Sequence, residues 1–69
     1  MGLQNIGYKE LLRLIAKLPP DARTVFNMYV VEGYSHKEIA ETLGFTEATS
    51  RSKLQRARLR LQELIKQEL

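Results

Sequence analysis

The 69-residue sequence contains no cysteine, no tryptophan and one histidine, His36. Without cysteine the chain cannot form disulfides or cysteine-ligated metal sites, and the usual ligand sets of zinc are missing. No combination of acid, base and nucleophile resembling a catalytic triad is present either. We therefore expect no enzymatic activity, no cofactor and no bound metal.

Long apolar runs are also missing. No stretch of the sequence approaches the length of a membrane span. Residues 1–5 lack the charged and apolar regions of a secretory signal peptide. The apolar fraction of 43% is ordinary for a folded domain. These features together predict a single small cytoplasmic domain that does not contact a membrane.

The positive charge lies at one end of the chain. The formal net charge is +3, and residues 1–46 carry equal numbers of acidic and basic side chains. The whole excess therefore belongs to residues 47–69, as expected when one element approaches a polyanion. The alternative is a solvated helix face, because surface helices often carry such charge. Charge alone does not distinguish the two interpretations.

The hydrophobic periodicity predicts four helices and no strand. Their expected bounds are 5–18, 20–32, 36–43 and 47–67, and residues 1–4 are expected to form a disordered leader. On the first three helices and the turn that follows them, the residues expected to face the core are Ile6, Leu11, Leu12, Leu14, Ile15, Leu18, Val25, Phe26, Met28, Tyr29, Val30, Ile39, Ala40, Leu43 and Phe45. The third and fourth helices are joined by three residues including a glycine, which is typical of a helix-turn-helix. The expected fold is a small all-α domain with a long C-terminal helix.

Local signals mark the ends of these helices. Residues 19–20 are both proline, which ends the first helix and suits the first position of the second. Gly33 and Gly44 suit the left-handed position that terminates a helix. Ser35 and Glu38 have the spacing of a capping box, in which each side chain bonds the other residue's backbone amide. Thr46 and Glu47 give the last helix a cap and an acidic first turn.

The last helix has two distinct faces. Its apolar seam consists of Leu54, Ala57, Leu61 and Leu64, at spacings of three and four residues. Opposite the seam, at about 100° per residue, lie Thr49, Ser52, Gln55 and Arg56. A helix that packs on one side and presents arginine, glutamine, serine and threonine on the other is suited to a DNA groove.

Three segments, in this order, carry a resemblance to a known family. Residues 18–26 begin Leu-Pro-Pro-Asp-Ala-Arg, residues 32–44 contain Gly-Tyr-Ser-His-Lys-Glu-Ile-Ala, and residues 49–58 read Thr-Ser-Arg-Ser-Lys-Leu-Gln-Arg-Ala-Arg. Over about residues 8–66 the chain resembles region 4 of bacterial RNA polymerase sigma factors, in particular the extracytoplasmic-function class. Ser50 departs from the valine found in many members, which should make the packing of the turn slightly more polar.

The resemblance implies a function and a set of contacts. Region 4 binds the minus-35 element of double-stranded promoter DNA through its last helix, docks on the β flap of the RNA polymerase core, and is covered in many members by an anti-sigma factor. By position, the residues that would read bases are Arg51, Ser52, Gln55 and Arg56. The residues that would contact the DNA backbone are Ser35, His36, Lys37, Thr49 and Lys53.

Each of these roles has a plainer alternative. Arg56 and Gln55 could simply be solvated, and Arg51 fits a phosphate contact as well as a base contact. The hydroxyls of Ser52 and Thr49 could bond within the helix, and His36 could be an ordinary surface residue.

Leu59 lies among the outward residues. It is a candidate contact for a protein partner or a thymine methyl group, although single exposed leucines are common. The alternative functions are a protein-interaction module, docking on the β flap or on an anti-sigma factor, and another kind of helix-turn-helix regulator. With no second apolar face apparent, we expect a monomer.

Overall fold

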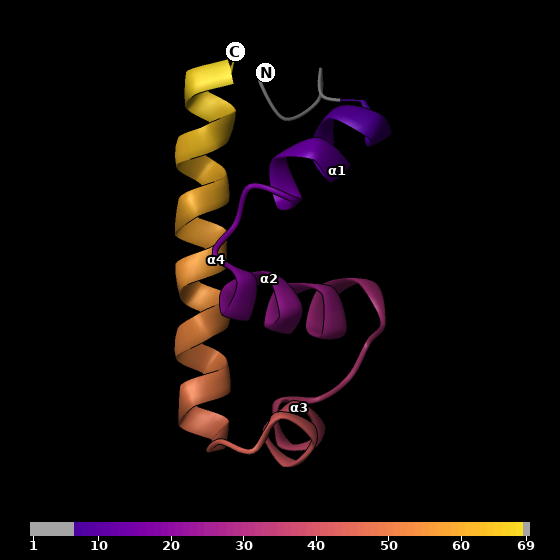
Figure 1. Ribbon diagram of the computed structural model, residues 1–69, viewed down its shortest axis with the longest axis vertical. Helices are drawn as coiled ribbons and strands as arrows, with labels where there is room; N and C mark the ends of the chain where they lie inside the picture. Colours follow the sequence, from indigo (N-terminus) through magenta and orange to yellow (C-terminus); the bar gives the residue numbers. More distant parts are fainter. Residues whose placement is uncertain (1–6, 69) are drawn as a thin grey trace.

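The computed structural model describes residues 7–68, and all of its regular elements are helical (Figure 1). In chain order they are α1 (Tyr8–Ile15), α2 (Pro20–Phe26), the π-helical turn η2 (Asn27–Val31), α3 (His36–Leu43) and α4 (Glu47–Glu68). Within residues 7–68 there is no strand. The predicted all-α class with a long last helix is confirmed.

Helix α4 is the element on which the others are arranged. The molecule is 36 Å long, close to the ~33 Å that a helix of this length spans. Figure 1 shows α1, α2 and α3 one below another along a single side of α4. Each of the three earlier helices therefore packs against a different stretch of the same long helix.

The first helix is shorter than the sequence predicted. It ends at Ile15 rather than at residue 18, and the chain then tightens into a turn. There the amides of Lys17 and Leu18 bond carbonyls only three residues back, at 3.0 and 3.1 Å. The tightening has a local cause, because Pro19 disfavours helical backbone in the residue before it. The predicted start at residue 5 and the predicted leader at 1–4 lie outside the described residues.

The second helix ends with a widened turn. Over Asn27–Val31 the backbone bonds shift to the π pattern, as in the bond from the Glu32 amide to the Asn27 carbonyl at 3.0 Å. Gly33 then adopts φ 80°, and the chain reverses into the loop before α3. Gly44 adopts φ 82° at the end of α3. Both glycines therefore terminate helices as predicted.

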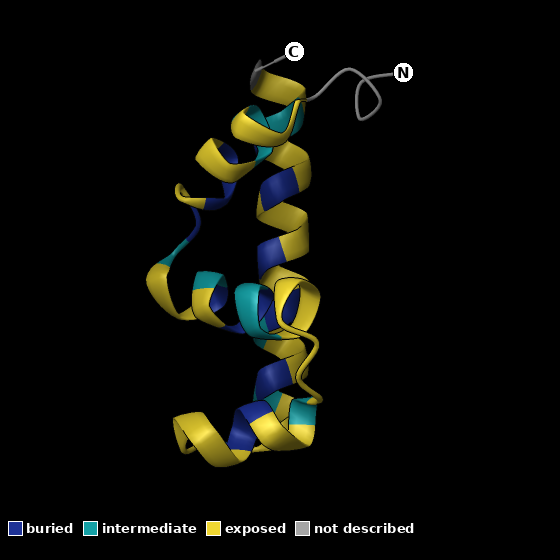
Figure 2. Cartoon of the chain, turned by 90° about the vertical axis from the view of Figure 1, so that its right-hand side faces the viewer, coloured by how far each residue is buried: buried dark blue, intermediate teal, exposed yellow. Residues whose placement is uncertain are grey.

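The core lies between α4 and the three helices that cover it. All four predicted seam residues are buried, namely Leu54, Ala57, Leu61 and Leu64. They meet residues from each earlier helix, chiefly Leu14, Ile15, Leu18, Ala22, Val25, Phe26 and Ile39. Figure 2 shows the buried positions of α4 as a stripe on the side facing the other helices.

Four residues expected to face the core are instead exposed, and one of them is Tyr29, at 36%. The exposed fractions are 45% for Leu12, 50% for Val30 and 38% for Leu43. Each short helix has only α4 as its main packing partner, so it buries a narrow stripe. Leu12 points away from the stripe that contains Leu14. Tyr29 and Val30 lie in η2, none of whose residues is buried, and Leu43 is the last residue of α3.

Candidate nucleic-acid interface

The four residues predicted to read bases lie together on the solvent side of α4. Arg51, Ser52, Gln55 and Arg56 are all exposed. They occupy about two turns near the start of the helix, opposite the buried seam. At ~1.5 Å of rise per residue they span roughly 7–8 Å along the axis, a patch small enough to enter one stretch of a major groove.

The first turn of α4 is capped by the side chain of Thr46. The Thr46 hydroxyl accepts the Thr49 amide at 3.1 Å and donates to the Thr49 hydroxyl at 2.9 Å. The predicted cap at Thr46 is confirmed. Thr49 is half-buried, and its hydroxyl already has one partner inside the protein. The Thr49 hydroxyl therefore uses part of its hydrogen-bonding capacity inside the protein, as the plainer alternative for this residue supposed.

At the start of α3 the predicted capping box is present. The Ser35 hydroxyl accepts the Glu38 amide at 3.1 Å, and the Ser35 amide donates to Glu38 Oε1 at 2.9 Å. The hydrogen bond from the Ser35 amide is the main reason why the pKa of the Glu38 carboxyl is below its usual value, and the Ser35 side chain lowers that pKa further. Lys37, one position before Glu38, is exposed and has the position that the resemblance assigns to a DNA backbone contact.

His36 is more than a surface residue. Its ring stacks on that of Tyr29, with centroids 4.4 Å apart and planes 17° from parallel. Its Nδ1 lies 2.8 Å from the hydroxyl of Ser50, which is fully buried. Burial lowers the pKa of His36, and the positive charge of Arg51 lowers it further. Sequence reasoning missed this link from η2 through α3 to α4, although a serine within the predicted packing surface was a signal for it.

The Tyr29–His36–Ser50 link limits what His36 can offer to DNA. With Nδ1 bonded to Ser50, only the other ring nitrogen could reach a phosphate. The ring is half-buried, and its burial lowers the pKa of His36, which reduces the positive charge that it can offer to a phosphate. The backbone-contact role of His36 remains a prediction, with a smaller electrostatic component than a surface histidine would have.

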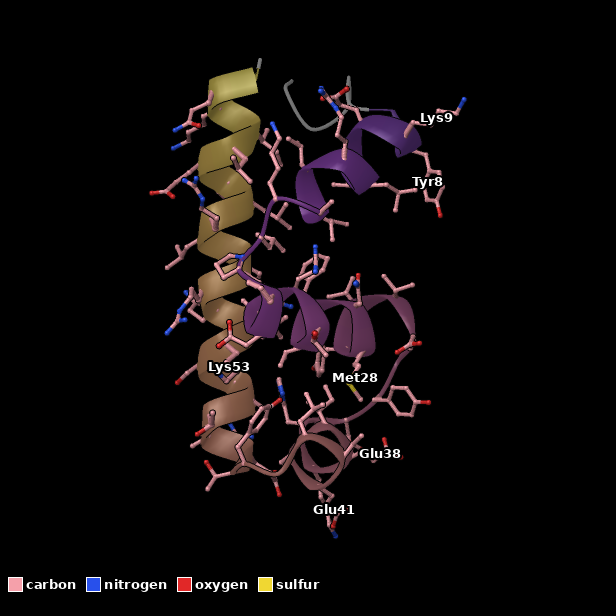
Figure 3. All side chains as sticks on the ribbon, viewed as in Figure 1. Tyr8, Lys9, Met28, Glu38, Glu41 and Lys53 are labelled. Carbon is pink, nitrogen blue, oxygen red and sulfur yellow. The ribbon has the colours of Figure 1, made fainter. Side chains whose placement is uncertain are left out.

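Lys53 turns toward the protein rather than away from it. Its ammonium group forms an ion pair with Asp21 at the start of α2 and lies 5.6 Å from the centre of the Phe45 ring. Only 19% of its side chain is exposed, and Figure 3 shows Lys53 where α4 meets the beginning of α2. The hydrogen bond from Lys53 is the main reason why the pKa of Asp21 is lowered.

The exposed arginines also have acidic neighbours. Arg56 Nη1 lies 3.9 Å from the same Asp21 oxygen, and Arg51 Nη1 lies 3.7 Å from Glu47 one turn earlier. Both arginines remain more than half exposed, so each pair contributes little to the stability of the fold. Leu59 is 52% exposed and follows Arg56 by about one turn on the same side of α4.

No group of three histidine or acidic side chains within residues 7–68 is placed to hold a metal ion. None of the helices in this part of the chain is long and apolar enough to cross a membrane.

Comparison with protein families matches residues 8–61 to the family described as Sigma-70, region 4. Comparisons with curated proteins and with solved structures gave no significant match. The family match covers well over half of the chain, including the helix-turn-helix and the exposed patch on α4. Region 4 is a DNA-binding, non-enzymatic helix-turn-helix domain of transcription initiation. This chain therefore belongs to the sigma-70 region 4 family.

Proposed function

We propose that this chain binds the minus-35 promoter element of double-stranded DNA, as the region-4 domain of a sigma factor of the extracytoplasmic-function class. The observation that carries the proposal is the exposed patch on α4. Four side chains suited to base and phosphate contacts project from one face of the second helix of a helix-turn-helix. The chain that contains this helix belongs to a DNA-binding family of transcription initiation. The proposed setting is the bacterial cytoplasm, with the isolated domain a monomer.

Two side chains of the patch suit different bases. Arg56 can bond the O6 and N7 atoms of guanine, and Gln55 can bond the N6 and N7 atoms of adenine. A good bidentate pair of this kind is worth about 1–3 kcal/mol of discrimination. Arg51 and Ser52, on the flank and in the middle of the patch, could read an adjacent base or hold a phosphate.

Contacts to the DNA backbone would come from both helices of the motif. The proposed residues are Ser35, His36 and Lys37 at the start of α3, and Thr49 and Lys53 on α4. Of these, Lys53 could contact a phosphate fully only by leaving its ion pair with Asp21. Backbone contacts position a protein on the duplex without reading its sequence. Among these residues Lys37 is exposed, whereas the polar groups of the others have partners within the protein.

The test is selection of duplexes from a random DNA pool at low salt, followed by titration of the winner and of a scrambled duplex. Arg56→Ala should weaken binding to the selected duplex by roughly 5- to 150-fold more than binding to the scrambled one. Arg13→Ala is the matched control, because it removes the same charge from a similarly exposed side chain, 58% against 62%, on α1. Equal losses on both duplexes for Arg56→Ala would reject the base-reading role.

Leu59 supports a second candidate function, docking on another protein. A leucine that is 52% exposed beside the DNA patch is suited to an apolar contact with the β flap of RNA polymerase or with an anti-sigma factor. Leu59→Ser should weaken such a complex while leaving DNA affinity unchanged. DNA binding falls steeply with salt, whereas an apolar contact does not, so a salt titration of each complex separates the two functions.

A further inference from the structure

We infer that Asp21 is a specificity-determining residue of the DNA-binding surface. It holds Lys53 away from solvent and thereby weakens binding to DNA of arbitrary sequence. This inference rests on the proposed function, since it concerns the balance between non-specific and specific binding by the same face of α4. Asp21 belongs to α2, outside both helices that would contact DNA.

Lys53 has two partners inside the protein. Asp21 Oδ2 accepts a hydrogen bond from its ammonium group, and the centre of the Phe45 ring lies 5.6 Å from that group. The other oxygen of Asp21 accepts the Ala22 amide at 2.9 Å, which fixes the carboxylate in the first turn of α2. An isolated surface ion pair is worth little because its side chains are mobile, but this lysine is only 19% exposed.

The pair changes the electrostatics of DNA binding. A phosphate can contact Lys53 only by displacing the carboxylate of Asp21 or by lying next to it, and like charges at that distance repel. Non-specific affinity depends almost entirely on neutralised phosphates and the counterions they release. Asp21 therefore removes roughly one phosphate contact from every sequence alike.

Base reading should suffer less. Asp21 Oδ2 lies 3.9 Å from Arg56 Nη1, near enough to attract the guanidinium without covering it, since 62% of the Arg56 side chain is exposed. A positioned arginine loses less conformational freedom when it binds a base. The same carboxylate therefore lowers affinity for all DNA through Lys53 while it favours the productive position of Arg56.

The test measures salt dependence in Asp21→Asn, which keeps the shape of the side chain and removes its charge. On a scrambled duplex the slope of log affinity against log salt should steepen by about 0.9, the value for one additional phosphate. Between 50 and 200 mM salt this corresponds to an additional loss of about threefold. The ratio of selected to scrambled affinity should fall. Asp21→Glu, which retains a carboxylate, should restore both quantities at least in part.

Two further variants make the test specific. Glu10→Gln removes one negative charge from an ion pair with Arg13 on α1, so it reproduces the change in net charge without touching Lys53. Lys53→Ala should flatten the slope by about one contact in the Asp21→Asn background and by much less in the natural sequence. The inference is overturned if Asp21→Asn leaves the slope unchanged, if Glu10→Gln steepens it equally, or if Lys53→Ala acts alike in both backgrounds.

Failure of the proposed function would give a different result. A domain that bound selected and scrambled duplexes equally would not read sequence, yet the slopes on scrambled DNA would still report whether Asp21 restrains Lys53. The two conclusions are therefore tested by separate quantities, the affinity ratio in one case and the salt slope in the other.

Discussion

The hydrogen bond between His36 and Ser50 gives the most direct test of what holds α4 against α3. Ser50→Ala removes the hydroxyl from a fully buried position, and His36→Phe removes the ring nitrogen while keeping a ring that can stack on Tyr29. Each single change, and the two together, should leave α3 and α4 as helices, because the caps of both lie elsewhere.

The size of the effect follows from the geometry. The Nδ1 to Oγ distance of 2.8 Å is that of a good hydrogen bond, and such a bond contributes about 0.5–1.5 kcal/mol net. We expect Ser50→Ala to lower the free energy of unfolding by about 1 kcal/mol. In a domain of this size that is roughly 4–8 °C in melting temperature.

A pH titration adds an independent check, because His36 is the only histidine. Its pKa in the folded chain is lowered by burial and by Arg51 and Arg58, with Glu47 opposing. As the pH falls, the unfolded chain therefore binds the proton at a higher pH than the folded chain does. The contribution of this group to the free energy of unfolding is fully present above its ordinary pKa of 6.5. That stability should be lost as the pH falls through the folded value. His36→Phe should abolish this part of the pH dependence.

The assay is chemical denaturation of the natural chain, both single variants and the double variant, at pH 8 and in steps down to pH 5. The double-mutant cycle isolates the interaction between the two side chains. A coupling energy near 1 kcal/mol at pH 8 is expected. A coupling energy within about 0.3 kcal/mol of zero, the usual error of additivity, would refute the argument. So would a stability that rises on acidification between pH 7 and 5.

Three other changes test the fold by thermal or chemical denaturation. Ser35→Ala removes one half of the capping box and should lower the free energy of unfolding by about 1 kcal/mol; no loss would mean that water replaces the cap. Gly44→Ala places a side chain at φ 82°, where the left-handed backbone costs about 1–2 kcal/mol, and a neutral result would contradict that conformation. Leu54→Ala opens a cavity in a 3% exposed position and should cost about 2–5 kcal/mol, whereas Leu59→Ala, on the exposed side, should cost far less.

Several helix ends were predictable because their causes are local, whereas the end of α1 at Ile15 was predicted three residues too late. Gly33 and Gly44 take the left-handed conformation, Ser35 and Glu38 form their capping box, and Thr46 caps α4. Each signal acts within about one helical turn, so it can be recognised from neighbouring residues alone. The seam of α4 was predictable for a related reason, since four apolar residues at helical spacing leave one face to bury.

The exposure of the four side chains predicted to read bases could be foreseen from the sequence, but the contacts around them could not. Sequence order places Arg51, Ser52, Gln55 and Arg56 on one exposed face, and the structure agrees on that exposure. The sequence did not indicate that the Lys53 side chain would turn inward to Asp21. The two positions are 32 residues apart, and only the way α2 crosses α4 brings them together.

What the sequence determined by itself is the set of helices, their caps and the two faces of α4, because periodicity and capping depend on covalent neighbours. The tertiary structure alone decided which apolar residues are covered, so that Leu14 is buried and Leu12 is exposed. It also decided that His36 bonds Ser50, 14 residues away, and that Asp21 of α2 forms an ion pair with Lys53 of α4. These contacts depend on where one helix crosses another, and short-range sequence patterns do not specify that geometry.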